Sequence, residues 1–459
     1  MEKGIYVLCF LCVFFTSLQV VISDTGYFWH ITDFHYDFTY HGRQLSCNKT
    51  NVPDNVGQFG DFWCDSPWLL VNSSVRAMAD IKYDVDFVLW TGDTVLHGKN
   101  EDLSYDINAG ILENVTEVIK TTLPGVPVYA TFGNHDYFPN NQFPPNNNLL
   151  YNDTLNRWGS WLDDPSQHDN FRKGAFYTKK TRYGLRIVAL NTNLYYTSNK
   201  AILNYTDPAD QIAWLNSTLA QARTNKEKVL VTAHIPPGVH TPNGLIWMHL
   251  VYHEPLVSVL RGFTDIIVAM HFGHDHADGF KILKNDKDGS AAPIFIAPSV
   301  TPWRYVIPSH IGPAHNPGIR LVKYDRSTGI HLEIEQHYLD LLKANKNGAA
   351  MWELEYKTSS HYGLDRLTAA DLSNLAEKMK EASSNEFKNY WKFNRVTPPE
   401  NLAEACNEEC HSSIICGFTE FDMDNFKSCK ASMVSTASTL SNAVVYILIK
   451  LVVLCVLLN

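Results

Sequence analysis

Short apolar runs alternate along the chain with longer stretches in which apolar residues recur at helical spacing. The short runs are rich in β-branched and aromatic residues, and we expect strands at 27–32, 87–91, 128–131, 187–190, 229–233, 266–269 and 294–297. Helices are expected at 73–82, 105–121 and 209–223, while the asparagine- and proline-rich segment 138–148 indicates a loop. This alternation predicts a layered α/β domain, which we place at 24–345.

The pattern changes near Trp352. Residues 368–390 are charged with helical spacing, Ala369-Ala370-Asp371 marks a helix start, and a cysteine-containing stretch follows at 406–429. We therefore expect a small helical C-terminal subdomain, held by disulfides, over 346–430. A chain of 459 residues is long enough for one large domain with such an appendage.

Both ends of the chain are apolar. Met-Glu-Lys is followed by an apolar run over 5–22 and then by Ser23-Asp24, which is typical of a secretory signal peptide over 1–23, with a signal anchor as the alternative. At the other end, small polar residues at 431–438 precede an apolar segment, 443–458, which Lys450 interrupts and which is short for a membrane span of about 20 residues. This order predicts a GPI-attachment signal over 431–459, with a tail-anchored helix as the alternative. We therefore expect an extracellular protein that a GPI anchor holds at the cell surface, on the plasma membrane.

Sequons and cysteines agree with export. N-glycosylation sequons begin at Asn48, Asn72, Asn114, Asn152, Asn204 and Asn216. Between the two apolar ends the chain contains Cys47, Cys64, Cys406, Cys410, Cys416 and Cys429. Their clustering favours a Cys47–Cys64 bridge and two local bridges among the last four. A structural zinc at the C-terminal cysteines is the alternative, which an oxidising compartment disfavours.

Charge narrows the possible partners. The formal net charge of -10 offers no basic excess to neutralise the phosphates of a nucleic acid, so we expect no nucleic-acid partner. A small anionic substrate is compatible with this charge because bound metal ions can meet it locally. We expect the protein to be a monomer.

Residues that can bind metals follow five of the expected strands. They lie in Asp33-Phe34-His35, Gly92-Asp93, Gly133-Asn134-His135-Asp136, the single His234 and Gly273-His274-Asp275-His276. In open α/β sheets, sites form in the crevice outside the carboxyl ends of the strands. The positions of these residues therefore predict that their side chains converge.

The residue types fit a pair of divalent cations. Imidazole favours zinc and its neighbours, while carboxylate and amide oxygens also accept Mn²⁺ or Mg²⁺. Asp93 is the expected bridge, because a carboxylate can bind two cations at once and Gly92 lets the backbone turn tightly before it. Two cations about 3.5–4 Å apart clamp the attacking and leaving oxygens of a phosphoryl displacement and lower the pKa of a bound water to about 7. We expect two Zn²⁺ per chain, with other divalent metals possible, and hydrolysis of a phosphate ester.

In this order, the motifs resemble those of the calcineurin-like metallophosphoesterases. The likeness to the acid sphingomyelinase branch rests on 92–97 (Gly-Asp-Thr-Val-Leu-His), 234–238 (His-Ile-Pro-Pro-Gly) and 316–320 (Asn-Pro-Gly-Ile-Arg). It covers roughly 25–429 and implies a layered β-sandwich flanked by helices, with 24–345 as the catalytic domain. The resemblance implies one metal on Asp33, His35, Asp93 and His276, and the other on Asp93, Asn134, His234 and His274. It also implies that His97 and His135 face the phosphate, where they stabilise or protonate the leaving oxygen.

Other polar residues receive structural interpretations. Asp136 and Asp275 are expected to orient neighbouring groups. Trp303-Arg304-Tyr305 either walls the substrate pocket or covers a sheet edge. Hydrogen-bonded structural roles are expected for His240, His249, His253, His271, His310 and His315.

Two differences from related families reduce the range of expected substrates. Leu96 stands where purple acid phosphatases have a metal-binding tyrosine, and Asp33 follows the expected signal peptide too closely for a saposin-like lipid-handling domain. The resemblance therefore favours soluble phosphodiesters and nucleotide-like substrates, such as CDP-choline or ATP. Sphingomyelin is an alternative, because a GPI anchor already places the enzyme at the bilayer. Further alternatives are a nucleotidase or phosphomonoesterase, and a non-catalytic surface regulator, against which the intact ligand set argues.

Overall fold

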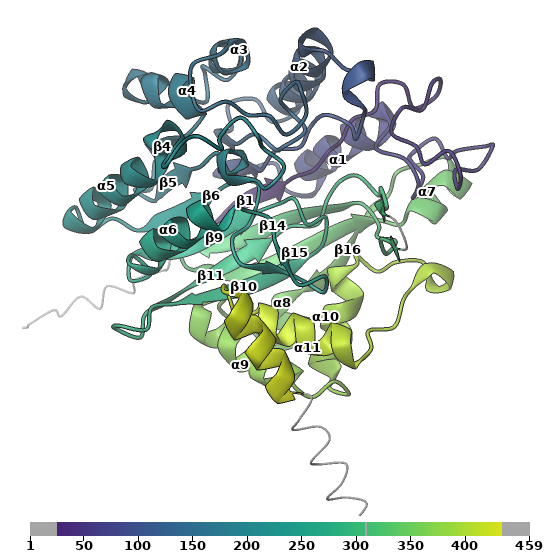
Figure 1. Cartoon of the computed structure of the whole chain (residues 1–459). Coiled ribbons are helices and arrows are strands. Elements are labelled where there is room, and N and C mark those ends of the chain that lie inside the picture. Colours follow the sequence, from purple (N-terminus) through teal and green to yellow (C-terminus); the bar gives the residue numbers. More distant parts are fainter. Residues whose placement is uncertain (1–24, 308–309, 434–459) are drawn as a thin grey trace, which may run out of the picture.

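Two six-stranded sheets lie face to face at the centre of the molecule, as the computed structural model shows for residues 25–307 and 310–433 (Figure 1). The predicted signal peptide and most of the predicted GPI-attachment signal lie outside these described residues. Within them, no helix has both the length and the apolar character that a membrane crossing requires.

The first sheet has the strand order β16-β15-β14-β1-β2-β3. Its parallel half consists of β1 (Thr25–Ile31), β2 (Phe87–Trp90) and β3 (Val128–Ala130). Its antiparallel half consists of β14 (Gly318–Asp325), β15 (His331–Leu339) and β16 (Trp352–Lys357). β16 lies beyond residue 345, so this sheet continues past the boundary predicted for the main domain.

The second sheet has the order β10-β11-β9-β6-β5-β4. Four central strands run parallel, namely β5 (Arg186–Ala189), β6 (Val229–Thr232), β9 (Ile267–Phe272) and β11 (Ala291–Ile296). The antiparallel edges are β4 (Tyr177–Lys180) and β10 (Gly279–Lys284). Two short hairpins lie apart from the sheets, β7 (Val239–His240) with β8 (Leu245–Ile246) and β12 (Val306–Ile307) with β13 (His310–Ile311).

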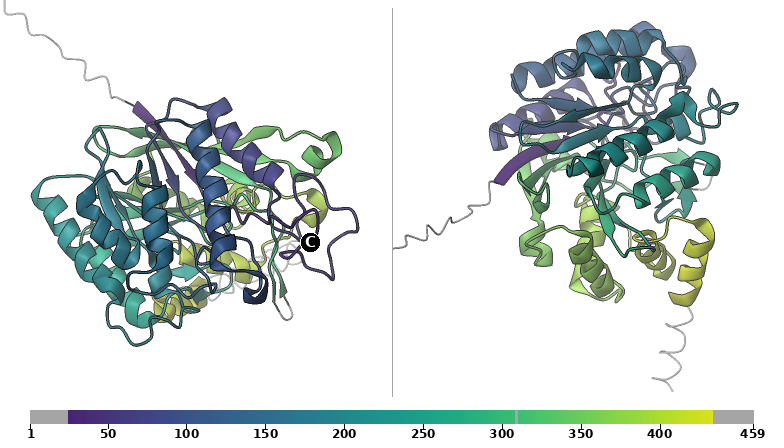
Figure 2. Two further views of the ribbon diagram at one scale, coloured as in Figure 1. Left: turned by 90° about the horizontal axis from the view of Figure 1, so that it is seen from above. Right: turned by 90° about the vertical axis from the view of Figure 1, so that its left-hand side faces the viewer.

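Helices cover the outer faces of the sandwich (Figures 1 and 2). The helices of the main domain are α1 (Trp68–Ile81), α2 (Tyr105–Thr122), α3 (Leu149–Arg157), α4 (His168–Gly174), α5 (Gln211–Thr224), α6 (Leu250–Arg261) and α7 (Leu341–Asn347). Short 3₁₀ turns occur at Asn100–Asp102, Pro165–Gln167, Thr192–Tyr195, Pro208–Asp210 and Glu400–Leu402. α2 shows why such segments fold locally, because the Ser104 hydroxyl caps its first turn and its inner face buries Leu112, Val115 and Ile119.

The helices α8 (Thr358–Tyr362), α9 (Ala369–Met379), α10 (Asn385–Asn394) and α11 (Glu408–Gly417) form the C-terminal part of the chain, drawn in yellow-green and yellow at one end of the sandwich in Figure 1. Thr368 and Asp371 form a capping box that starts α9, close to the predicted helix start. The predicted helical stretch 368–390 is interrupted between α9 and α10. α9 packs against β10 and β11, and α8 packs against β15 and β16, so this helical part contacts both sheets.

The cysteines pair locally. The structure contains the disulfides Cys47–Cys64, Cys406–Cys410 and Cys416–Cys429. The expected Cys47–Cys64 bridge and the two local bridges among the last four cysteines are confirmed. The zinc alternative for the C-terminal cysteines is wrong, since every one of them is bonded to another sulfur. The six sequon asparagines all lie at least partly at the surface, and their glycosylation stays a prediction.

All seven predicted strands are present, within a few residues of their expected ends. The predicted loop 138–148 is free of helix and strand, and α1 begins at Trp68, before the expected start at residue 73. Sequence reasoning missed the strands β4, β10, β14, β15 and β16. These strands carry polar side chains such as Lys281, Lys323 and Glu335 among their apolar ones, which hides them from a search for apolar runs.

Aromatic and histidine side chains fill the space between the sheets. Phe28 of the first sheet stacks on Phe87 with ring centroids 4.6 Å apart and meets His271 of the second sheet edge-on at 5.4 Å. His271 contacts His30 (Nδ1–Nδ1, 3.2 Å) and His331 (Nε2–Nε2, 2.7 Å), so three fully buried histidines connect the two layers. Burying each large aromatic side chain stabilises the fold by about 1.5–3 kcal/mol. This packing fixes the sheets against each other and so aligns the strand ends that carry the site.

Candidate metal centre

The side chains that follow β1, β2, β3, β6 and β9 meet at one end of the sandwich. Five of them sit on backbone with positive φ, which non-glycine residues seldom adopt: Asp33 (51°), His35 (42°), Asp93 (52°), His274 (70°) and His276 (54°). Each such residue costs about 1–3 kcal/mol, and strain of this kind concentrates at functional sites. The backbone therefore turns sharply after each strand to aim these side chains inward.

Asp93 lies at the centre of the cluster. Its Oδ2 is 3.1 Å from His234 Nε2 and 3.4 Å from His35 Nε2, while its Oδ1 accepts a 2.8 Å hydrogen bond from the backbone N–H of His135. One carboxylate oxygen therefore faces two imidazole nitrogens that come from different strands. This is the geometry that a bridging ligand requires.

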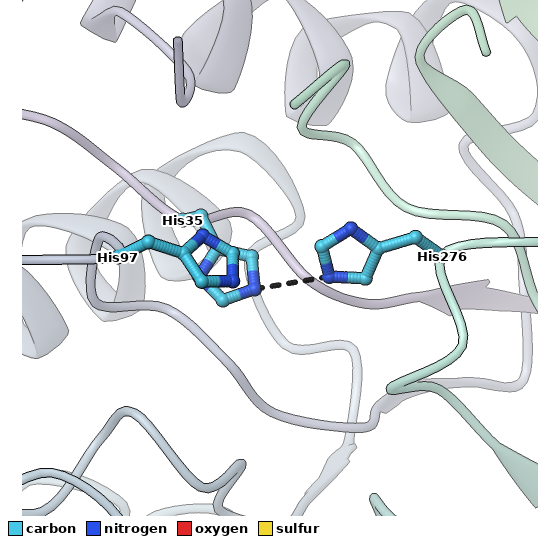
Figure 3. Close-up of side chains that lie close together, drawn as sticks. All are labelled: His35, His97 and His276. Carbon is cyan, nitrogen blue, oxygen red and sulfur yellow. Dashed lines mark hydrogen bonds between the residues drawn. The ribbon is translucent and has the colours of Figure 1, made fainter. Parts of the chain in front are cut away.

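One group of ligand atoms gathers on the β1 side. His35 Nε2 and His276 Nε2 are 3.2 Å apart, and Asp33 Oδ1 is 3.4 Å from His276 Nε2 and 3.8 Å from His35 Nε2. Figure 3 shows His276 pointing toward His35 across this space. Together with Asp93, these atoms are the four ligands expected for the first metal.

A second group gathers on the β6 side. His234 Nε2 is 3.1 Å from Asn134 Oδ1 and 3.3 Å from His274 Nδ1, and Asp93 Oδ2 completes the set. These are the four ligands expected for the second metal. The structure thus brings all seven predicted ligands together, and ligand atoms within 4.8 Å of one another define the groups Asp93–His234–His274, Asp33–His35–Asp93 and His35–His97–His276.

Hydrogen bonds behind the ligands fix which atoms face the centre. His35 Nδ1 is 2.8 Å from the carbonyl of Val95, and His234 Nδ1 is 2.7 Å from the carbonyl of Thr91. Each ring therefore donates from Nδ1 and turns Nε2 toward the site. Thr32 Oγ1 donates to Asp33 Oδ2 at 2.6 Å, leaving Asp33 Oδ1 for the centre.

The protonation of the cluster fits cation binding. Burial lowers the pKa of His35 and of His274 to about 3, which keeps both imidazoles neutral as metal ligands must be. Burial also lowers the pKa of His234, but the adjoining Asp93 carboxylate outweighs it and raises that pKa to about 9. A proton shared by His234 and Asp93 thus holds these two side chains together, and a divalent cation that bound both of them would displace this proton. Two carboxylates, four imidazoles and one amide are a donor set that fits two divalent cations.

His97 borders the first ligand group. Its ring stacks on His35 at 3.9 Å, as Figure 3 shows, and its other face stacks on Trp303 at 3.9 Å. Buried Asp65 accepts hydrogen bonds from the backbone N–H of His97 (2.6 Å) and from Nδ1 (2.9 Å), and Thr301 donates to the same carboxylate at 3.1 Å. His97 therefore presents Nε2, and its orientation depends on Asp65, a residue that the sequence did not single out.

His135 lies beside His97. The ring centroids of the two residues are 4.4 Å apart, and the His135 ring meets His35 edge-on at 5.3 Å. Its Nδ1 is buried without a hydrogen-bond partner among the described residues. Both histidines predicted to act on the phosphate thus border the metal ligands.

Asp136 and Asp275 act behind the ligands. Asp136 accepts backbone hydrogen bonds from Gly133 (2.7 Å), Thr94 (2.7 Å) and Asp93 (3.2 Å), which ties the second ligand loop to the third. Asp275 Oδ1 accepts from Trp247 Nε1 at 2.8 Å and lies 3.0 Å from His240 Nδ1. Both carboxylates orient their neighbours, as expected.

Aromatic side chains stand at two sides of the centre. Trp303 lies against His97, so of the two interpretations of 303–305 the structure supports a wall of the site for this residue. Arg304 instead donates to the carbonyl of Gly312 and lies over the Trp63 ring, away from the ligands. On the opposite side, Trp247 meets His274 edge-on at 4.8 Å and Tyr196 does so at 5.4 Å.

Four of the histidines for which hydrogen-bonded structural roles are expected have polar partners, while the side chain of His310 lies outside the described part of the structure. His253 Nε2 accepts from the backbone of Gly238 (3.0 Å), His315 Nε2 lies 3.1 Å from Ser299 Oγ, and His271 belongs to the buried histidine group described above. His240 pairs with Asp275. His249 packs edge-on against Tyr252, but its Nε2 is buried without a hydrogen-bond partner among the described residues, so the hydrogen-bonded role expected for it is wrong.

Comparisons with known proteins agree with this site. A family model described as calcineurin-like phosphoesterase matches residues 26–278, and one described as acid sphingomyelin phosphodiesterase C-terminal region matches residues 290–435. The chain is 36% identical over 417 residues to acid sphingomyelinase-like phosphodiesterase 3b of Homo sapiens, covering 89% of this chain and 90% of that protein. It is 35% identical over 412 residues to the cyclic GMP-AMP phosphodiesterase SMPDL3A of Homo sapiens, with coverages of 88% and 90%. It is 30% identical over 441 residues to sphingomyelinase phosphodiesterase C of Dictyostelium discoideum, with coverages of 92% and 97%. The chain therefore belongs to the calcineurin-like phosphoesterases, within the acid sphingomyelinase group, and is a metal-dependent phosphodiesterase.

Proposed function

We propose that this phosphodiesterase uses two divalent cations, zinc in the first instance, to hydrolyse small phosphodiesters of the nucleotide or phospholipid-headgroup type at the cell surface. The observation that carries the proposal is the position of Asp93 Oδ2, which lies 3.1 Å from His234 Nε2 and 3.4 Å from His35 Nε2. One cation would be held by Asp33, His35, Asp93 and His276, and the other by Asp93, Asn134, His234 and His274.

The bound cations supply Lewis acidity and a water that is acidic enough to be deprotonated near neutral pH. The chain itself positions and protonates the substrate. His97, held by Asp65, presents Nε2 beside His35 and stabilises a phosphoryl oxygen there. His135 lies 4.4 Å from it, ring centre to ring centre, and delivers a proton to the departing oxygen.

The aromatic residues favour a substrate with a planar group next to its phosphate. Trp303 stands on the His97 side and Trp247 on the His274 side, so each offers an aromatic surface near one end of the centre. Stacking of a nucleobase on such a side chain contributes about 1–3 kcal/mol. One relative is a cyclic GMP-AMP phosphodiesterase and another is a sphingomyelinase phosphodiesterase, so both nucleotide diesters and sphingomyelin enter the substrate panel.

The cell-surface location is proposed from the sequence. An apolar N-terminal segment, six sequons and a C-terminal apolar tail after small polar residues support a secreted, glycosylated and GPI-anchored protein. Release of the protein from intact cells by a phosphatidylinositol-specific phospholipase C tests the anchor. Protein that stays on the cells after that treatment would contradict it.

Hydrolysis by the purified protein tests the activity. We expect bis-p-nitrophenyl phosphate to be cleaved faster than p-nitrophenyl phosphate, with activity lost to a chelator and restored by Zn²⁺. Faster cleavage of the monoester would favour the nucleotidase alternative. If the metal-loaded protein cleaved neither ester, the proposed activity would be wrong, and the alternative of a non-catalytic surface regulator would remain.

A further inference from the structure

Among the seven expected ligands, Asn134 is the only amide, and its side chain can bind a metal in only one of its two orientations. A carboxylate presents an oxygen whichever way it turns, whereas an amide presents an oxygen on one side and an NH₂ group, which cannot bind a cation, on the other. In the structure, Asn134 Oδ1 faces His234 Nε2 at 3.1 Å. Something on the far side of the amide must select this orientation.

The Asn141 side chain makes that selection. Asn134 Nδ2 donates a 2.8 Å hydrogen bond to Asn141 Oδ1, and the backbone N–H of Asn141 donates to the carbonyl of Asn134 at 2.9 Å. With an acceptor oxygen on that side, the reversed amide would place two oxygens against each other and an NH₂ group toward the metal. The hydrogen bond to Asn141 therefore favours the orientation in which Asn134 turns Nδ2 toward Asn141 and Oδ1 toward His234.

Further contacts of the loop hold Asn141 in place. Asn140 donates from Nδ2 to the carbonyl of Gly98 (2.8 Å), and Gln142 donates from Nε2 to the carbonyl of Ser198 (2.9 Å). Phe143 is fully buried, and its carbonyl accepts from Asn199 Nδ2 at 2.8 Å. Asn141 itself has a φ of 68°, a conformation that asparagine, aspartate and glycine tolerate. These contacts hold the backbone at Asn141 and so keep its side chain beside Asn134 before a metal arrives.

We infer that Asn141 is a positioning residue for the second metal, which it serves by locking the Asn134 amide with Oδ1 toward that metal. This inference rests on the proposed role of Asn134 as a ligand. Loss of a hydrogen-bond partner behind a ligand typically weakens metal binding by about 10–100-fold. The asparagine-rich loop 138–148 then has a function in the site that its composition alone does not reveal.

Two substitutions at one position separate this role from a structural one. Asn141→Gly keeps the positive φ and the backbone hydrogen bond but removes the acceptor. Asn141→Asp keeps an acceptor that cannot reverse. Asn146→Ala is the matched control, because Asn146 is an exposed asparagine of the same loop that lies outside the contacts holding Asn134 and Asn141.

The readout is zinc content per chain at buffered free Zn²⁺, together with the visible spectrum of the Co²⁺-loaded protein. We expect Asn141→Gly to bind the second cation about 10–100-fold more weakly, while Asn141→Asp and Asn146→Ala bind two cations as the wild type does. Full second-site affinity in Asn141→Gly, or its loss in Asn141→Asp with circular dichroism unchanged, would overturn the inference. Wild-type protein that binds no metal at all would instead contradict the proposed function.

Discussion

Replacement of Arg320 by methionine tests how the sandwich holds the last ligand loop. The guanidinium is fully buried and forms an ion pair with Asp278 (Nη2–Oδ1, 2.6 Å). It also donates from Nε to Gln336 Oε1 (2.9 Å) and from Nη1 to the carbonyl of Ile296 (3.1 Å). Asp278 follows the proposed metal ligand His276 by two residues, so this pair ties the end of that loop to β14.

The expected cost follows from the charge that is left behind. Methionine keeps most of the volume, but the Asp278 carboxylate then stays buried with the Tyr356 hydroxyl as its remaining side-chain donor. Removing one partner of a buried ion pair destabilises a protein by about 3–5 kcal/mol. The double variant Arg320→Met with Asp278→Asn removes both charges, and we expect it to be more stable than Arg320→Met alone.

Urea unfolding followed by circular dichroism measures these differences. Arg223→Met is the matched control, because Arg223 pairs with Asp265 on the surface, where such pairs contribute about 0–1 kcal/mol. If Arg320→Met cost no more than this control, or if the double variant were the least stable of the three, the reasoning about the buried charge would be refuted.

Three further variants test the site and the core. His135→Ala should keep its metals but lose diester hydrolysis by about 10²–10⁴-fold, and full activity would exclude His135 as the proton donor. Trp303→Leu should raise KM for a nucleotide diester about 5- to 150-fold, the equivalent of about 1–3 kcal/mol of stacking, and leave KM for a diester without a base unchanged; equal effects on both would argue against stacking. Burial lowers the pKa of His331 to about 4 from an ordinary 6.5, so below pH 6.5 protons favour the unfolded chain and stability falls until about pH 4. His331→Gln should lessen that fall by about 3 kcal/mol in unfolding measured across this pH range, and an unchanged pH dependence would contradict this account.

The parallel strands and the proposed metal ligands could both be predicted from the sequence, because the ligands directly follow the strands. Short buried strands appear as apolar runs, and the polar residues that follow them must meet at the same edge of a sheet. Asp33, Asp93 and His234 could therefore be placed together from the printed sequence. The antiparallel strands β14–β16 and β10 were missed because polar side chains alternate with apolar ones along them.

The residues behind the ligands are harder to find from sequence. Asp65 reaches His97 across 32 positions and lies in a segment without regular structure, while Asn141 lies in a loop whose asparagines look alike. Such partners depend on how loops cross in space, which no local pattern encodes. For Asp65, the sequence offered one local indication of an ordered position, the predicted Cys47–Cys64 bridge, which holds the segment directly before it.

The central claim is that Asp93 joins two metals in one site. Elemental analysis of the purified wild type and of Asp93→Ala, with bis-p-nitrophenyl phosphate hydrolysis measured on the same samples, tests it most directly. We expect two zinc ions per chain and chelator-sensitive hydrolysis in the wild type, and loss of both metals and of activity in the folded variant. Folded wild-type protein without metal or activity, or an Asp93→Ala variant that retains two metals and hydrolyses the diester, would contradict the account.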